Sequence, residues 1–302
     1  MHRSIPQKLN FFLALSLLSL HLFAFYFLPL IFPHNSTLTG GFLLLAALLT
    51  PQLWALTHDA GHGVLFKNRR LNNLFGRMMS IAFGSNFKLL QFGHNVHHGF
   101  NRTEVDRTDL FPKSSGFLSA NLSYYAKIFF ALYLGELLMP FLFLLPRSVI
   151  SRLAGLILLN KSPDHTKVYE QLHTTVLSDK NLRTVRIDTL ILTAHFFLLA
   201  NLFAEHLYLL GIFVLVRGFM VSFFDNIYHY GTAENIDYSY NLRLPAVISR
   251  LLLNFNYHQV HHAYPNVSWY NLPNVFETKR FEFDKQYGKA LLNQLRGPIY
   301  IN

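Results

Sequence analysis

The chain has 302 residues, of which 51% are hydrophobic and only 14% are charged, with 30 phenylalanines and no cysteine. Soluble domains carry about 25% charged residues, so this composition favours a membrane protein. The lack of cysteine excludes disulfides, thiolate nucleophiles and cysteine–metal sites, and leaves the 16 histidines and the carboxylates as the candidate ligands for any metal.

Two apolar runs near the N-terminus predict a helical hairpin. Residues 11–32 are almost entirely apolar and exceed the roughly 20 residues that a membrane span needs. This run is longer than the core of a signal peptide and has no small-residue cleavage site, so we expect a retained span. A second apolar run over 41–57 follows a polar turn at 33–40. The two runs therefore predict two spans joined by a short turn.

A second pair of apolar runs covers residues 187–203 and 206–224. Between the two pairs, residues 126–159 are also apolar but include Glu136 and end in a weakly hydrophobic stretch, so we expect a re-entrant or interfacial element there. The sequence thus predicts an all-α integral membrane protein with about four spans in two hairpins. We expect it to form a single domain over residues 1–302.

Lysine and arginine predict the orientation of the spans. The two short turns inside the hairpins contain neither residue, whereas residues 146–186 contain seven. The positive-inside rule then places both termini and the large loops in the cytoplasm, and it explains most of the formal net charge of +10 without nucleic acid. An even number of crossings must separate 58–113 from 225–302, which favours the half-inserted form of 126–159. We expect a multi-pass protein of a bacterial inner membrane.

Four histidine groups lie at the predicted cytoplasmic ends of these spans. On a helix, residues three or four apart share one face, so each group directs its side chains to one side. One such group often arises by chance, but four groups that hold nine of the sixteen histidines are hard to attribute to packing. The pattern predicts a metal site in a helical cytoplasmic cap. The groups are 58–62 (HDAGH), 94–98 (HNVHH), 225–229 (DNIYH) and 258–262 (HQVHH).

The number of histidines indicates two metals. A mononuclear site rarely needs more than three or four protein ligands, whereas nine imidazoles suit two metals with four or five ligands each. Imidazole binds zinc, copper, iron and nickel, so the ligand type alone leaves the element open. Zinc hydrolases usually keep three protein ligands and add a catalytic acid or base, whereas two histidine-rich metals suggest redox chemistry with dioxygen.

The strings HDAGH, HNVHH and NYHQVHH resemble the three histidine boxes of the membrane fatty acid desaturase/hydroxylase superfamily, over roughly 58–113 and 225–275. The resemblance implies a non-haem centre of two iron ions that uses O2 and two electrons to remove hydrogen from a methylene group. A second removal gives an alkene, and oxygen insertion gives an alcohol. The metal ligands that it implies are His58, His62, His94, His97, His98, His258, His261, His262 and, between the second and third boxes, His229.

Four polar residues near the boxes are candidates for supporting roles. Animal acyl-CoA desaturases have Asn one turn before the extra histidine, where this chain has Asp225, so we expect Asp225 to bind metal directly or through water. We expect Asp59, Asn95 and Asp106 to hydrogen-bond the distal nitrogens of liganding histidines. Asp106 is equally suited to pairing with a neighbouring arginine.

Arg217 lies inside the predicted last span, where a charge is costly and usually faces a partner or a cavity. It shares one helix face with Asp225 and His229, eight and twelve residues further on. We expect it to pair with Glu136 or to contact a polar group of the substrate.

The reaction itself stays open at the level of sequence. The leading hypothesis is a desaturase that introduces a double bond into a fatty acyl chain and receives electrons from a separate protein of the ferredoxin or cytochrome b5 type. Hydroxylation, carotenoid ketolation and oxidative decarboxylation are alternatives on the same scaffold. A membrane metal transporter or metal-binding protein is a further alternative. However, transporters place their ligands near the middle of the bilayer, and these boxes lie at span ends.

Overall fold

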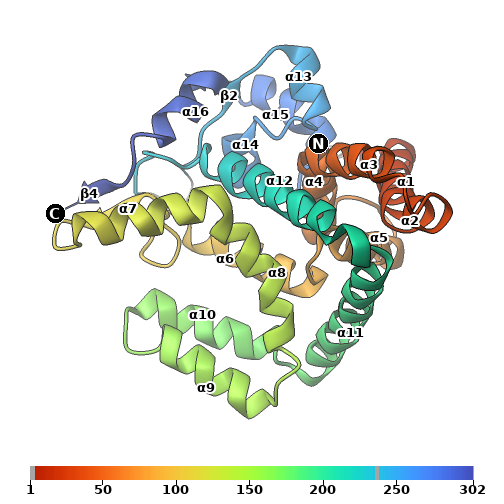
Figure 1. The fold of residues 1–302 in the computed structure, drawn as a ribbon. Helices are drawn as coiled ribbons and strands as arrows, with labels where there is room; N and C mark the ends of the chain where they lie inside the picture. The colour runs from red at the N-terminus through yellow and green to blue at the C-terminus, as the bar shows by residue number, and fades with distance from the viewer. Residues whose placement is uncertain (1–3, 235–237, 302) are drawn as a thin grey trace.

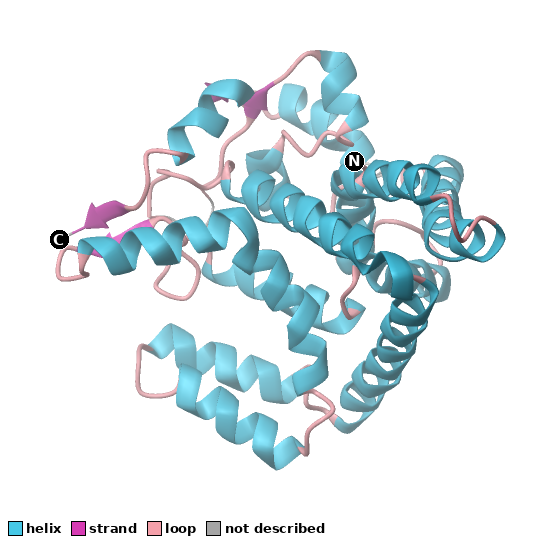
Figure 2. Cartoon of the chain, in the orientation of Figure 1, coloured by secondary structure: helices cyan, strands magenta, loops and turns pink. Residues whose placement is uncertain are grey.

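The computed structural model describes residues 4–234 and 238–301, and most of this chain is helical, as predicted (Figure 1). The few strands are short and lie at the margin of the helical body (Figure 2). Four helices are long and apolar enough to cross a membrane, or five if one bent pair counts as a single span. This composition and helix length identify a multi-pass membrane protein.

The first predicted hairpin is present, but its second arm is bent. A continuous apolar helix of 25 residues precedes two helices that meet the length and hydropathy of a span only together and bend by 47°. The bend coincides with Pro51, which fits the first turn of a helix but not its interior, so a new helix begins there. The elements are α1 (Gln7–Leu22), η1 (Phe23–Phe27), α2 (Leu28–Ile31), α3 (Ser36–Leu48) and α4 (Thr50–Gly61).

The second predicted hairpin is also present, with arms of 24 and 23 residues. Its first arm begins about two turns before the predicted span, because a polar amphipathic stretch continues the same helix. The elements are α11 (Asp179–Leu202), η3 (Ala204–His206) and α12 (Leu207–Asn226).

The middle of the chain differs from the prediction. A single apolar helix of 26 residues runs over Phe117–Leu142, so it begins before the predicted element over 126–159 and ends within it, and its length alone does not distinguish a crossing from a re-entrant or interfacial helix. Pro140 does not shorten it, because it lies in the last turn. A separate antiparallel pair of helices follows and lies beside its end (Figure 1). The elements are α7 (Phe117–Ala126), η2 (Lys127–Ala131), α8 (Leu132–Leu142), α9 (Arg147–Leu158) and α10 (Pro163–Thr174).

Short elements after the first and second hairpins complete the fold. Two parallel strand pairs, β1 with β4 and β2 with β3, tie the C-terminal region to segments far away in the sequence. The elements are α5 (Arg69–Phe83), α6 (Phe87–Phe100), β1 (Leu110–Pro112), β2 (Leu242–Arg243), α13 (Ala246–Leu251), α14 (His258–Ala263), η4 (Trp269–Asn271), α15 (Leu272–Thr278), β3 (Lys285–Gln286), α16 (Tyr287–Gln294) and β4 (Ile299–Ile301).

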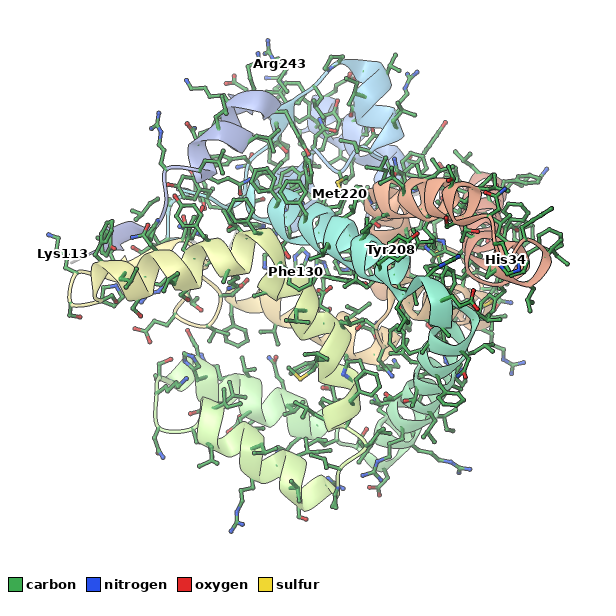
Figure 3. All side chains as sticks on the ribbon, viewed as in Figure 1. His34, Lys113, Phe130, Tyr208, Met220 and Arg243 are labelled. Atoms are coloured by element: carbon green, nitrogen blue, oxygen red, sulfur yellow. The ribbon has the colours of Figure 1, made fainter. Side chains whose placement is uncertain are left out.

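Helix α12 packs against the π-helical turn η2. Gly218 makes this approach feasible, because a Cβ atom at that position would overlap the ring of Phe130. Phe130 lies on η2 where the long middle helix faces α12 (Figure 3). The contact fixes the position of η2, which forms one wall of the cavity described below.

Arg217 joins several helices inside the membrane-spanning part, but it does not pair with Glu136 as expected. Its guanidinium donates to Thr50 Oγ1 at 3.2 Å, to the Ala82 carbonyl at 2.6 Å and to His21 Nε2 at 2.6 Å. It also lies 4.3 Å from the centre of the Phe213 ring. Ala82 is in the last turn of α5, where carbonyl groups lack helical partners, so the cation caps that helix. Arg217 therefore connects α1, α4, α5 and α12.

Candidate metal centre

Nine histidines from four elements converge at one end of the helical body, and they are the nine that the boxes predict. Helix α4 ends at the first box, and α6 carries the second box on its last two turns. The short helix α14 carries the third box, and His229 lies in the turn directly after α12. The helical spacing of three and four residues turns the imidazoles of each element to a common side.

The first group contains five histidines whose ligand atoms all lie within 4.8 Å of one another. His58 and His98 each place Nε2 2.9 Å from Nε2 of His261. His94 lies between two partners, with Nε2 2.9 Å from that of His62 and 3.0 Å from that of His98. Three elements thus contribute ligand atoms to this group.

The second group contains His97, His229, His258 and His262. Nε2 of His262 lies 3.2 Å from that of His97 and 3.2 Å from that of His258, and Nε2 of His258 lies 3.1 Å from that of His229. Again three elements contribute, and α14 supplies residues to both groups. The third box therefore joins the two groups.

The donor set fits a metal in each group. A neutral imidazole carries one N–H donor and one acceptor nitrogen, and in both groups the Nε2 atoms face one another. Two nitrogens bound at about 2.1 Å to one metal and at right angles lie about 3.0 Å apart, which matches the Nε2 spacing. The Nδ1 atoms of His229 and His258 are buried without a hydrogen-bond partner among the described residues. Buried groups without partners are rare in stable packing and point to a functional site.

Burial keeps most of these imidazoles in the neutral form that binds metal. It lowers the pKa of His62 to about 4. Together with the nearby histidine charges, it lowers the pKa of His98 to about 3. Burial also places the pKa of other members of both groups well below the ordinary value, namely His94, His229, His258, His261 and His262.

His97 differs because a carboxylate contacts it. Its Nδ1 lies 2.5 Å from Oδ2 of Asp106, which leaves Nε2 directed at the second group. Burial alone lowers the pKa of His97, but the charge and hydrogen bond of Asp106 outweigh it and raise the pKa. Burial likewise raises the pKa of Asp106, but His97 outweighs it and holds that pKa at about 2. This is the carboxylate–histidine contact that the sequence predicts for Asp106.

The alternative pairing of Asp106 with an arginine is not formed. Arg102 is buried and pairs instead with Asp109, at 2.5 Å. Arg107 lies near Glu104 and Glu234, at 3.8 and 3.6 Å. The neighbouring arginines thus have other partners, and Asp106 is left to His97.

The other two predicted supporting residues behave differently from Asp106. Asp59 is buried, but its Oδ1 lies 3.8 Å from Nδ1 of His58, beyond hydrogen-bond distance. Its Oδ2 accepts from the backbone N–H of Trp269 at 3.1 Å. Asn95 is exposed on α6, and the structure gives it no hydrogen bond to a histidine among the described residues. Asp59 therefore links α4 to the C-terminal region rather than orienting a ring.

The comparison with family models gives one match, to the family described as Fatty acid desaturase, over residues 35–291. The chain belongs to the fatty acid desaturase family. The match includes all four histidine groups, so the family and the geometry point to the same residues. No curated protein and no solved structure matches this desaturase-family chain. The family places it among membrane oxidoreductases of lipids.

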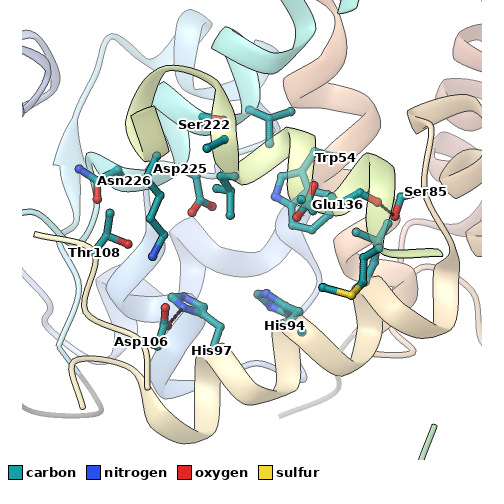
Figure 4. A pocket seen from close by; sticks show the side chains of 18 of the residues that line it. Trp54, Ser85, His94, His97, Asp106, Thr108, Glu136, Ser222, Asp225 and Asn226 are labelled. Atoms are coloured by element: carbon teal, nitrogen blue, oxygen red, sulfur yellow. Dashed lines mark hydrogen bonds and ion pairs between the residues drawn. The ribbon is translucent and has the colours of Figure 1, made fainter. Parts of the chain in front are cut away.

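A cavity of about 1220 Å³ borders both histidine groups of this desaturase-family protein. Small-molecule sites usually measure about 300–1,000 Å³, so there is room for a long ligand. His94 and His97 point into it from α6, with Asp106 beside His97 (Figure 4). Away from the histidines the walls come from the middle helix, from α9 and α10 and from α13. Apolar side chains line the part between α9 and α10, including Ile150, Leu153, Ile157, Val168 and Leu172.

Asp225 belongs to this cavity rather than to either histidine group. It is not among the residues whose ligand atoms lie within 4.8 Å of one another. Its side chain faces the cavity beside Asn226, whereas Trp54, Ser85 and Glu136 face it from the other side (Figure 4). Asp225 thus lines the same cavity as His94, His97 and His258, but lies outside the two sets of closely spaced ligand atoms.

Sequence reasoning missed the polar lining contributed by the middle helix. Lys127 lines the cavity from η2. Glu136 was singled out as a partner of Arg217, yet it lines the cavity, and its Oε2 is buried without a partner among the described residues. A lysine and a glutamate within one apolar helix are the signal in the sequence that marks this wall.

Proposed function

We propose that this protein is an O2-dependent membrane desaturase that introduces a double bond into a fatty acyl chain. The observation that carries the proposal is the meeting of two histidine groups with a large, mostly apolar cavity. We propose one iron ion for each group, held by the five and the four histidines given above. The irons, with O2 and electrons from a separate protein, would supply the oxidising chemistry. A single domain over 1–302 follows, because both halves of the chain contribute ligands.

The chain's own residues would bind, orient and shield. Asp106 accepts from Nδ1–H of His97 and so fixes the ring with Nε2 toward the second group. The apolar walls bind a hydrocarbon chain and exclude water from the carbons next to the histidines. Asp225, which lines the cavity beside the second group, would support the metal of that group directly or through water.

We further propose that the histidine groups and both termini lie in the cytoplasm, in a bacterial inner membrane. The support is the lysine and arginine distribution of the sequence. The electron donor would then be a soluble or membrane-attached ferredoxin or cytochrome b5-type protein on that side.

Expression in a bacterial host, followed by fatty acid and hydrocarbon profiling, tests the reaction. A new double bond without added oxygen is the expected result. A product one oxygen heavier would contradict desaturation and support a hydroxylase or ketolase on the same scaffold. An alkene one carbon shorter would support oxidative decarboxylation. The purified protein should contain about two irons per chain. Labile zinc without any oxidised lipid would instead support a metal transporter.

A further inference from the structure

Charged residues gather in the part of the cavity near the second histidine group, whereas most of the remaining lining, apart from Glu136, is apolar. Lys127 and Asp225 both line the cavity there, beside His97 and Asp106. Within residues 4–234 and 238–301, Lys127 forms no hydrogen bond and no ion pair. An ammonium group therefore faces the cavity without a partner.

The position of Lys127 in a span-length helix makes this exposure to the cavity significant. A lysine in an apolar segment is costly unless it faces a cavity or a partner. The π-helical turn that begins at Lys127 widens the helix locally, and such turns often occur at functional sites. Gly218 and Phe130 hold this turn against α12, so the backbone that carries Lys127 is fixed by packing.

Lys127 does not serve as an ion-pair partner of the two nearby carboxylates, Asp106 and Asp225. Asp106 is already paired with His97, whose Nδ1 lies 2.5 Å from Oδ2 of Asp106. Asp225 forms no ion pair with Lys127 within 4.0 Å in the described part of the chain. The cation is thus available to an anion that enters the cavity.

We propose that Lys127 binds the carboxylate of a free fatty acid, whose hydrocarbon chain extends along the apolar walls toward α9 and α10. This inference rests on the proposed function and names its substrate class and binding direction. An ester or thioester has no negative charge at this point and would leave the ammonium unpaired. Because Lys127 and His97 line the same end of the cavity, the carbons nearest the second histidine group are those close to the carboxyl end.

A binding experiment without turnover tests the role of Lys127. The purified, metal-loaded protein in detergent is incubated with tritiated hexadecanoate, and unlabelled hexadecanoate or hexadecan-1-ol competes for it. A charge-assisted hydrogen bond distinguishes the two competitors, so the acid should bind about tenfold to a hundredfold more tightly than the alcohol. Lys127→Met should weaken binding of the acid by about the same factor and leave binding of the alcohol unchanged.

Two further variants separate binding from folding. Lys127→Arg keeps the cation and should restore most of the preference for the acid. Lys289→Met removes an exposed lysine on α16 and should change neither affinity. Equal binding of acid and alcohol by the unmodified protein would overturn the inference. An equal loss of affinity for the acid and the alcohol in Lys127→Met would also overturn it, because that result would indicate a structural role.

The failure of this inference can be told apart from the failure of the proposed function. Acid-specific binding that depends on Lys127, without any oxidised product, would support the inference and contradict the desaturase. Oxidised product without acid-specific binding would support the proposed function and contradict the role of Lys127. Hexadecanoate deuterated at carbons 2 to 4 tests the binding direction, since deuterium should be lost from these positions. Loss of hydrogen only from the middle of the chain would overturn the proposed direction.

Discussion

The first histidine group contains five imidazoles and the second contains four, and the two groups differ most in what surrounds them. Of the first group only His94 is among the described residues that line the cavity, beside Trp54, and its neighbouring carboxylate, Asp59, contacts a backbone N–H instead of a ring. The second has Asp106 on one of its rings and opens to the charged end of the cavity. A site with fewer protein ligands keeps room for a further ligand. This comparison suggests that the second group faces the substrate.

Removing a histidine from either group should have the largest effect. His261→Ala and His229→Ala should each abolish product formation, because both groups are needed to use O2. Each variant should lower the iron content from about two to about one per chain while leaving the amount of membrane-inserted protein unchanged. Iron analysis and lipid profiling of membranes measure both. His34→Ala, in the exposed turn after α2, is the matched control. Normal product from His229→Ala would show that this residue is no ligand.

The two carboxylates next to the histidines, Asp106 and Asp59, should differ in their effect on metal retention. Asp106→Asn should weaken metal binding by about tenfold to a hundredfold, because it removes the charge that orients His97. Asp59→Asn should have a much smaller effect, since Asp59 is 3.8 Å from His58 and mainly holds Trp269. Iron release to a chelator measures the difference. Equal losses of iron in the two variants would show that Asp106 does not support its histidine group more than Asp59 does.

In metal-free protein, His97 should respond to pH with the opposite sign from His62 and His98 of the first group. His62 and His98 have folded pKa values of about 4 and about 3. The unfolded chain takes up protons first, near pH 6.5, so stability falls as the pH drops below that value. His97 has a raised pKa, so its contribution is present below pH 6.5 and is lost as the pH rises through the folded value. Thermal unfolding of His62→Gln and His97→Gln separates these contributions. Parallel pH profiles for both variants would contradict the assignment.

The smallest effect should come from the packing behind the second group. Gly218→Ala forces a methyl group into the ring of Phe130 and should displace η2, at a cost of about 1–3 kcal/mol in unfolding free energy. Gly211→Ala lies on the same helix, where an added Cβ meets open space, and should leave stability almost unchanged. Thermal unfolding in detergent measures both. If Gly218→Ala is as stable as Gly211→Ala, the turn that carries Lys127 is not fixed by α12.

Much of the scaffold and all nine histidines could be predicted from the sequence. Apolar length gave the two hairpins, since crossing a bilayer requires about 20 apolar residues wherever they occur. The middle helix was misplaced because Ser, Tyr and Lys lower the hydropathy over 117–127, although they do not interrupt the helix. The expected Arg217–Glu136 ion pair is not formed, for a different reason. Both residues are costly in a span, but only the packing shows that Arg217 caps α5 whereas Glu136 faces the cavity.

The sequence by itself determined which residues meet, because spacing of three and four on helices fixes the direction of each histidine. It could not divide the nine histidines into five and four, since that depends on how α4, α6 and α14 cross. Tertiary structure also decided between the two partners considered for Asp106 and placed Asp225 in the lining of the cavity. Local spacing follows from backbone geometry, whereas partners distant in the chain are chosen only when the helices pack.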